Sequence, residues 1–140
     1  MNCRIYKSED FLDIEPLASF VETFLTKPGS ELRQKIANKT LTGTIAVVFD
    51  IGNGGVVGWA RTEEWFDADG GYWDTLEAFV DKTYRGKGIA SFAAAGLRAS
   101  GAFEAGTVAV FDPRMMMISQ KAGVHATLFT RKDEKTWAQA

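Results

Sequence analysis

Residues 76–100 (LEAFVDKTYRGKGIASFAAAGLRAS) limit the possible fold and ligand of this chain more than any other stretch does. Their apolar start, 76–80, predicts a short strand, and the small and apolar residues 89–99 predict a helix. A short basic turn with two glycines joins them. A strand that enters such a turn at a helix N-terminus offers an anion unpaired backbone N–H groups and the positive end of the helix dipole. The stretch therefore predicts a site for a phosphate or pyrophosphate.

The turn at residues 83–88 has the composition that such a site needs. Gly86 and Gly88 can adopt positive φ and bring the backbone close to a ligand, because they have no Cβ. Arg85 and Lys87 add two positive charges. We expect the turn to hold its ligand mainly through backbone N–H groups.

Two common nucleotide-binding motifs do not fit this turn. In a P-loop, GxxxxGK[ST], Asp81 would occupy the first glycine position and Gly88 the serine or threonine position. In the dinucleotide pattern GxGxxG, Ser91 would occupy the last glycine position. The anion is therefore predicted to belong to another kind of ligand.

Length and composition limit the classes of protein to which this chain can belong. The 140 residues predict a single domain, 1–140, which buries roughly two-thirds of its unfolded surface. Cys3 is the one cysteine, which excludes an internal disulfide and a cysteine-based zinc site. With one histidine as well, we expect no metal site. The net charge of −2 argues against a nucleic-acid partner.

The N-terminus, MNCRIYKSED, is charged too early for a signal peptide. No apolar run approaches the ~20 residues of a membrane-spanning helix. We therefore expect a cytoplasmic protein without a membrane partner.

The other segments predict alternating strands and helices. Asn53-Gly54 is a strong hairpin signal between two apolar runs. The predicted elements are a strand at 3–7, a helix after Asp13 with apolar residues Ile14, Leu17, Ala18, Val21 and Leu25, a short helix after Ser30, a hairpin of 44–49 and 56–61, a loop at 63–74, the strand at 76–80, the helix at 89–99, a strand at 107–111, a helix at 114–121 and a strand at 125–130.

The string YRGKGIA, after a strand that ends at Val80, resembles the acetyl-CoA signature of the GNAT superfamily of N-acetyltransferases. The family motif is [QR]-x-x-G-x-[GA], and Arg85-x-x-Gly88-x-Ala90 satisfies its letters. The segment 112–124 resembles the later family segment N-x-x-A-x-x-x-Y-x-K-x-G-F, and Val57-Gly58-Trp59 resembles the family's third strand. The resemblance covers about residues 43–130.

The resemblance implies a mixed, largely antiparallel central sheet flanked by helices, in the order β-α-α-β-β-β-α-β-α-β. It also implies that acetyl-CoA is the co-substrate, with its pantetheine arm along Phe79 and Val80 and a contact at Asp112. A backbone N–H near Val80 would polarise the thioester carbonyl. The residues whose backbone is implied to hold the pyrophosphate are Arg85, Gly86, Lys87, Gly88, Ile89 and Ala90.

Some family members use a carboxylate on the central strand as general base. Asp74 has the same strand parity as Val80 and is the first candidate, and Glu77 on the opposite face is the second. Ser119 stands where the family has the tyrosine that protonates the leaving thiolate, and Asp112 stands where it has asparagine. A serine is a poor acid, although a thiol with a pKa of ~8.5 can leave without one.

The segment 63–74 (EEWFDADGGYWD) combines five acidic and four aromatic residues. Acids beside aromatic faces suit a cation. Trp65, Asp69 and Trp73 are therefore candidates for binding an amine substrate, such as a basic protein or a polyamine. The alternative is a solvated loop that its aromatic residues anchor to the core.

These observations predict an N-acetyltransferase that moves an acetyl group from acetyl-CoA to a primary amine by direct transfer in a ternary complex. The alternative is a catalytically weak or inert acyl-CoA-binding or protein-interaction module of the same fold. The departures at Ser119 and Asp112 keep this alternative open. The oligomeric state stays open too, with a homodimer as one option.

Overall fold

The computed structural model describes residues 1–14, 31–104, 106–132 and 137–140. The helix predicted after Asp13 lies outside these residues. The elements in chain order are β1 (Asn2–Lys7), α1 (Ser8–Leu12), α3 (Glu31–Ala37), β2 (Thr44–Phe49), β3 (Val56–Thr62), β4 (Glu64–Phe66), β5 (Tyr72–Thr75), β6 (Glu77–Val80), the 3₁₀ turn η2 (Lys82–Tyr84), α4 (Ile89–Ala99), β7 (Thr107–Val110), α5 (Pro113–Lys121), β8 (His125–Arg131) and β9 (Trp137–Gln139).

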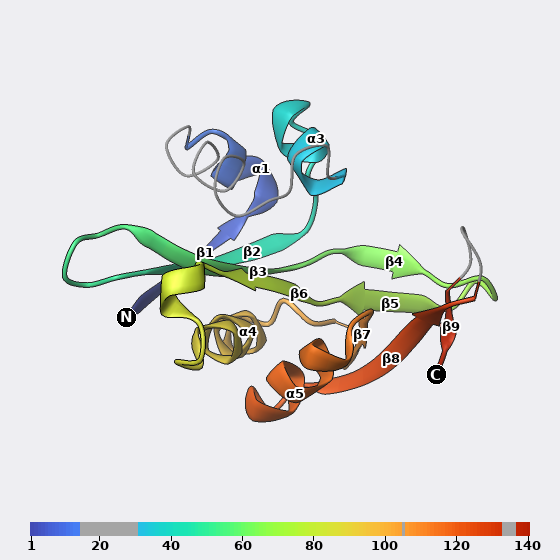
Figure 1. Cartoon of the computed structure of the whole chain (residues 1–140). Coiled ribbons are helices and arrows are strands. Elements are labelled where there is room, and N and C mark those ends of the chain that lie inside the picture. The colour runs from blue at the N-terminus through green and yellow to red at the C-terminus, as the bar shows by residue number, and fades with distance from the viewer. Residues whose placement is uncertain (15–30, 105, 133–136) are drawn as a thin grey trace.

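The strands form two sheets that share one continuous segment of chain (Figure 1). The first sheet has the order β1-β2-β3-β6 and is antiparallel throughout. The second has the order β4-β5-β7-β8-β9, and its pairs β5–β7 and β7–β8 are parallel. Because β5 and β6 are separated only by Leu76, residues 72–80 leave one sheet and join the other without a turn.

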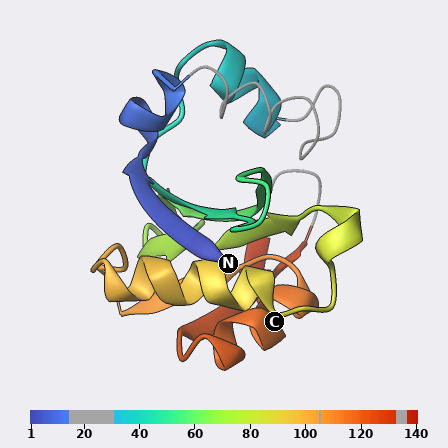
Figure 2. The ribbon, with the colours of Figure 1, turned by 90° about the vertical axis from the view of Figure 1, so that its left-hand side faces the viewer.

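Helices cover both faces of the first sheet (Figures 1 and 2). On one face lies α4, whose buried Ala93, Ala94 and Leu97 pack in one cluster with Ala46 and Ala60 of the sheet. Small residues on both sides let the helix approach the sheet closely.

On the other face α1 and α3 pack over a second cluster that includes Phe11, Ile36, Val47 and Trp59. Ile36, which is 5% exposed, is thus on the buried face of α3. Among the helices of the described ranges, none is long and apolar enough to cross a membrane.

The predicted mixed α/β fold class is confirmed. The hairpin of β2 and β3 is confirmed, and α4 has the predicted bounds, 89–99. The prediction of a loop at 63–74 is wrong, because β4 and β5 pair there as a second hairpin. Asp67 Oδ1 closes its turn by accepting hydrogen bonds from the N–H groups of Asp69 and Gly71, at 2.9 and 2.7 Å. The polar segment after β8 contributes a further strand, β9, which the sequence analysis did not predict.

Candidate functional site

A cleft opens where the two sheets separate. The last hydrogen bond between the segment 72–80 and β7 runs from Leu76 N to Ala109 O, at 3.1 Å. After Leu76 the chain continues as β6, which is the edge strand of the first sheet, while β7 remains in the second sheet between β5 and β8. The cleft has a volume of about 670 Å³ and runs from Leu76 along β6 to the glycine turn and α5. An edge strand offers backbone donors and acceptors to an extended ligand.

The glycine turn lies at one end of this cleft. Gly86 has φ +80°, and Gly88, the N-cap of α4, has φ +75°, so both adopt the left-handed conformation that the sequence predicts. The first helical bond of α4 runs from Phe92 N to Gly88 O at 3.0 Å. The N–H groups that precede it have no partner within the helix and are available to an anion.

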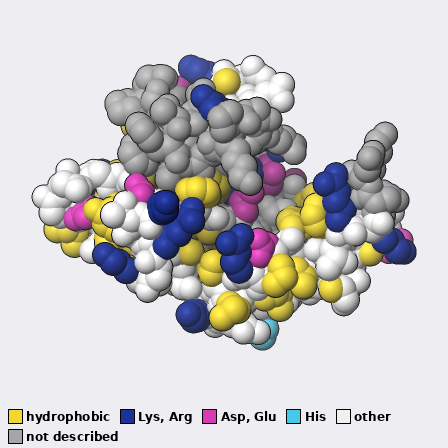
Figure 3. Space-filling view, viewed as in Figure 1, with side chains coloured by type: hydrophobic (Ala, Val, Ile, Leu, Met, Phe, Trp, Pro, Cys, Tyr) yellow, Lys and Arg dark blue, Asp and Glu magenta, His cyan; other side chains and the backbone are white. Residues whose placement is uncertain are grey.

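Basic side chains surround the turn (Figure 3). Arg85, Arg114 and Lys121 line the cleft. Arg85 Nε donates to Val80 O at 3.2 Å, and Lys87 Nζ lies 5.4 Å from the centroid of the Tyr84 ring. Most of the predicted cofactor residues line the cleft. They are Phe79, Val80, Arg85, Gly86, Gly88, Ile89, Ala90 and Asp112.

Tyr84 ties the turn to the first hairpin. Its hydroxyl donates to Asp50 Oδ2 at 2.7 Å. This hydrogen bond raises the pKa of Tyr84 and lowers the pKa of Asp50. Local sequence patterns do not indicate this contact, because its partners are 34 positions apart in the chain. Tyr84 also lines the cleft, so its anchored ring helps to shape the site.

Asp112 begins α5 as its N-cap. Its Oδ1 accepts from Arg114 N at 2.8 Å, and its Oδ2 lies 3.1 Å from Arg114 Nη2. The hydrogen bond from the Arg114 side chain lowers the pKa of Asp112. Its negative charge is therefore paired at the position where the resemblance implies a cofactor contact.

Glu77 brings a carboxylate to the cleft. Its side chain is 47% exposed and lines the cleft near the point where the sheets separate. Directly opposite on β3 lies Arg61, which is 3% exposed and forms a close ion pair with Glu77. A buried cation therefore holds the Glu77 carboxylate in place beside the sheet.

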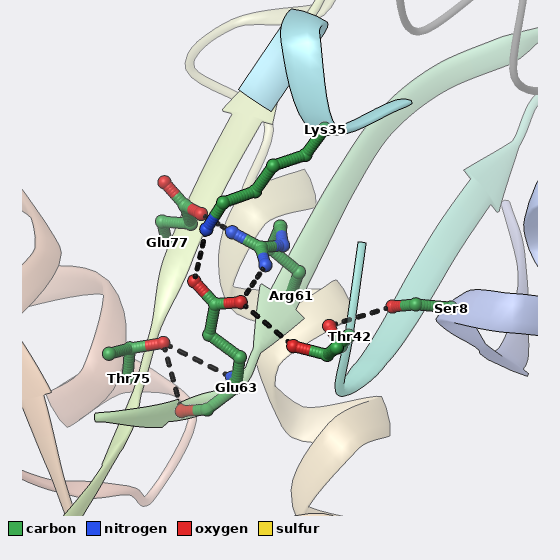
Figure 4. Close-up of polar contacts among 7 residues, drawn as sticks. All are labelled: Ser8, Lys35, Thr42, Arg61, Glu63, Thr75 and Glu77. Carbon is green, nitrogen blue, oxygen red and sulfur yellow. Dashed lines mark hydrogen bonds and ion pairs between the residues drawn. The ribbon is translucent and has the colours of Figure 1, made fainter. Parts of the chain in front are cut away.

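Arg61 belongs to a chain of charges that reaches α3 (Figure 4). Its Nη2 lies 2.7 Å from Glu63 Oε2, and Lys35 Nζ lies 3.4 Å from Glu63 Oε1. Thr42 Oγ1 donates to Glu63 Oε2 at 3.3 Å. The order Lys35, Glu63, Arg61, Glu77 alternates in sign, so each charge is next to an opposite one.

The other two predicted catalytic residues lie away from the cleft. Asp74 is 4% exposed and lines a different pocket, with Tyr72 Oη 3.5 Å from its Oδ1. Ser119 is fully buried in α5, and its hydroxyl donates to Met115 O at 2.7 Å. Of the three candidates the structure places only Glu77 in the cleft. Asp74 shares the strand parity of Leu76, Ala78 and Val80, which pack in one cluster, but it lies in β5, where the strand still pairs with β7 of the second sheet.

Trp65 and Trp73 pack against Phe129 in the second sheet, whereas the other two aromatic residues of 63–74, Phe66 and Tyr72, are exposed. Trp65 and Trp73 meet the buried Phe129 edge-on, with centroids 4.9 and 5.0 Å apart, respectively. Trp73 Nε1 donates to Asp67 Oδ2 at 2.8 Å, whereas Asp69 is exposed at the turn. None of the three predicted substrate residues lines the cleft, although Phe111 both lines it and contacts Trp65. This arrangement agrees with the anchoring alternative for these rings.

No family model matches the sequence, and no curated protein sequence matches it. Solved structures similar to the chain include N-acetyltransferases of the GNAT type. Glucosamine-6-phosphate N-acetyltransferase from Arabidopsis thaliana is 18% identical, with a TM-score of 0.47 over 89% of this chain and 92% of that one. An acetyltransferase from Trypanosoma brucei is 20% identical, with a TM-score of 0.41 over 96% of this chain and 84% of that one.

Proposed function

We propose that the protein is an N-acetyltransferase that uses acetyl-CoA and acts on a primary amine. The observation that carries this proposal is the edge of β6, which runs along the cleft from Leu76 to the glycine turn at the start of α4. One continuous surface thus offers strand-like hydrogen bonds and, at its end, a helix N-terminus. A pantetheine arm with a pyrophosphate at one end needs this combination.

The cofactor residues follow from this geometry. The backbone N–H groups between Gly86 and Ser91 would hold the pyrophosphate, with Arg85 and Lys87 adding positive charge. Backbone groups of Phe79 and Val80 would bind the pantetheine arm. When bound, acetyl-CoA supplies the acetyl thioester, and a backbone N–H near Val80 would stabilise negative charge on its carbonyl oxygen.

Glu77 is the general base in this proposal. As the amine nitrogen bonds to the acetyl carbon and the carbon–sulfur bond breaks, Glu77 accepts the proton that the nitrogen loses, directly or through one water. The sulfur leaves as thiolate and takes a proton from solvent, because Ser119 is buried and bonded to Met115. An acceptor with an α-amine, of pKa ~7.7–8.0, is deprotonated more readily than a lysine side chain.

Two measurements on the native protein test the proposal. Calorimetry should show saturable binding of coenzyme A, and mass spectrometry should detect acetylation in a panel of basic peptides, polyamines and amino sugars. Absence of coenzyme A binding would overturn the proposal. Tight binding without transfer to any amine would support the alternative, an inert acyl-CoA-binding module, which the departure at Ser119 favours.

A further inference from the structure

A second pocket lies at the opposite end of α4 from the glycine turn. It has a volume of about 370 Å³ and is formed by the end of β1, residues 41–44, the β3–β4 connection, β5 and the loop that follows α4. Figure 2 shows α4 from the side, from its yellow start near the glycine turn to the orange loop after Ala99. With a rise of 1.5 Å per residue, the two ends are about 16 Å apart. No described residue lines both the cleft and this pocket.

The lining of the second pocket is strongly acidic. The ammonium of Lys7 is its single cationic side chain among the described residues. Glu63 is committed to Arg61 and Lys35, and Asp74 is bonded to Tyr72, but Glu9, Glu64 and Glu104 outnumber Lys7 and leave the pocket with an excess of negative charge. The carboxylates that line it belong to Glu9, Glu63, Glu64, Asp74 and Glu104.

Tyr72 shows that these charges converge. Its hydroxyl lies 3.4 Å from Glu64 Oε1 and 3.5 Å from Asp74 Oδ1. Partial burial and the negative charges of Asp74, Glu64 and Glu104 raise the pKa of Tyr72. The negative charges of several carboxylates therefore converge on the Tyr72 hydroxyl in the wall of the pocket.

The end of α4 adds negative potential to the same pocket. Gly101 and Ala102, which follow the C-cap Ser100, line the pocket. The final carbonyl groups of a helix carry the negative end of its dipole, which favours a cation. The anion site and this pocket thus lie at the two oppositely charged ends of one helix.

Thr62 provides an independent observation. It lines the pocket, is 3% exposed, and its Oγ1 has no hydrogen-bond partner within the described part of the chain. A buried hydroxyl without a partner costs free energy, which a ligand that donates a hydrogen bond would remove. Carboxylates and this hydroxyl oxygen are all acceptors, so the matching ligand is rich in N–H donors.

We propose that the second pocket binds a small organic cation with two or more ammonium groups. Its volume exceeds that of a single ion, and its exposed carboxylates come from α1, β4 and the loop after α4, so they can pair with separate charges along one ligand. This site is distinct from the acceptor site at Glu77 and does not depend on acetyl transfer.

The test uses the full chain without coenzyme A and spermidine as the probe, at fixed ionic strength. We expect saturable binding by calorimetry and at least a tenfold loss of affinity in the double variant Glu64→Gln, Glu104→Gln, whose side chains are exposed. Thr62→Val, which keeps the shape of the side chain, should weaken binding severalfold. Asp10→Asn, a matched loss of one exposed carboxylate on α1, should leave the affinity unchanged.

Four results would overturn the proposal. They are an absence of saturable binding, an equal loss of affinity in Asp10→Asn, displacement of spermidine by magnesium at the same ionic strength, and loss of binding in Glu77→Gln with retention in the double variant. The last result would place spermidine in the acetyl-transfer site. Coenzyme A binding, measured on the same variants, reports separately on the proposed acetyltransferase.

Discussion

Arg61 and Glu77 face each other across neighbouring strands, one buried and the other half exposed at the cleft. The same guanidinium also pairs with Glu63, which lines the second pocket. A single buried cation therefore stands between a carboxylate of each pocket.

Replacing Arg61 with methionine should lower the free energy of unfolding by about 3 kcal/mol, toward the lower end of the range for a broken buried ion pair. The loss is limited because Glu77 is half exposed and Glu63 keeps Lys35 and Thr42. Urea denaturation measures it. Adding Glu63→Gln and Glu77→Gln to Arg61→Met should restore part of the stability, and a triple variant less stable than Arg61→Met would contradict this account.

Glu77→Gln should reduce acetyl turnover by about 10²–10⁴-fold, the usual contribution of a general base, with little change in the KM for acetyl-CoA. The amide keeps the shape of the side chain but accepts no proton. Steady-state kinetics with a fixed amine acceptor measure both constants, and Asp10→Asn serves as the matched control. If Asp74→Asn removed turnover while Glu77→Gln retained it, the base would lie on the other side of the strand.

Gly86→Ala should weaken coenzyme A binding by tenfold or more. Gly86 has φ +80° with no atom within 4 Å of the position that a Cβ would occupy, so the substitution strains the backbone that faces the ligand without a steric clash. Gly70→Ala is the matched control, because Gly70 has φ +79° and equally open surroundings in the β4–β5 turn. Both variants should lose similar stability in urea, but only the first should lose affinity by calorimetry.

Asp112→Asn should make the protein less sensitive to acid. Because the hydrogen bond from Arg114 lowers the pKa of Asp112 in the folded state, the stability it contributes is present above the unfolded value of ~3.9 and is lost as pH falls through the lowered pKa. Asparagine can still cap α5 but does not titrate. Urea denaturation from pH 5 down to about pH 2 should show a smaller decline for the variant than for the native protein. Parallel declines would show that Asp112 does not contribute.

Local sequence patterns predicted those features of the fold and the site that depend only on neighbouring residues. The bounds of α4 and the positive φ of Gly86 and Gly88 follow from composition alone, and so does the hairpin at Asn53-Gly54. The second hairpin was missed because its signal, Asp67 with Gly70-Gly71, lies in a segment whose acids indicate a solvated loop.

Contacts between distant segments could not be predicted in this way. Arg61 lies within the run VVGWART, and nothing local indicates that its charge is buried between Glu63 and Glu77. Asp74 lies away from the cleft because it belongs to β5 of the second sheet, and the point where the chain passes between the sheets is a property of the whole fold. The pairing of side chains across strands therefore accounts for most of what the sequence analysis missed.

The passage of residues 72–80 through both sheets has a mechanical consequence. Leu76, between β5 and β6, is 1% exposed and belongs to the core that packs against α4. The cleft is thus bordered by a segment that belongs to both sheets, and the residue that joins its two strands is packed in the core. The width of the cleft therefore depends on core packing at Leu76 as well as on the backbone of the glycine turn.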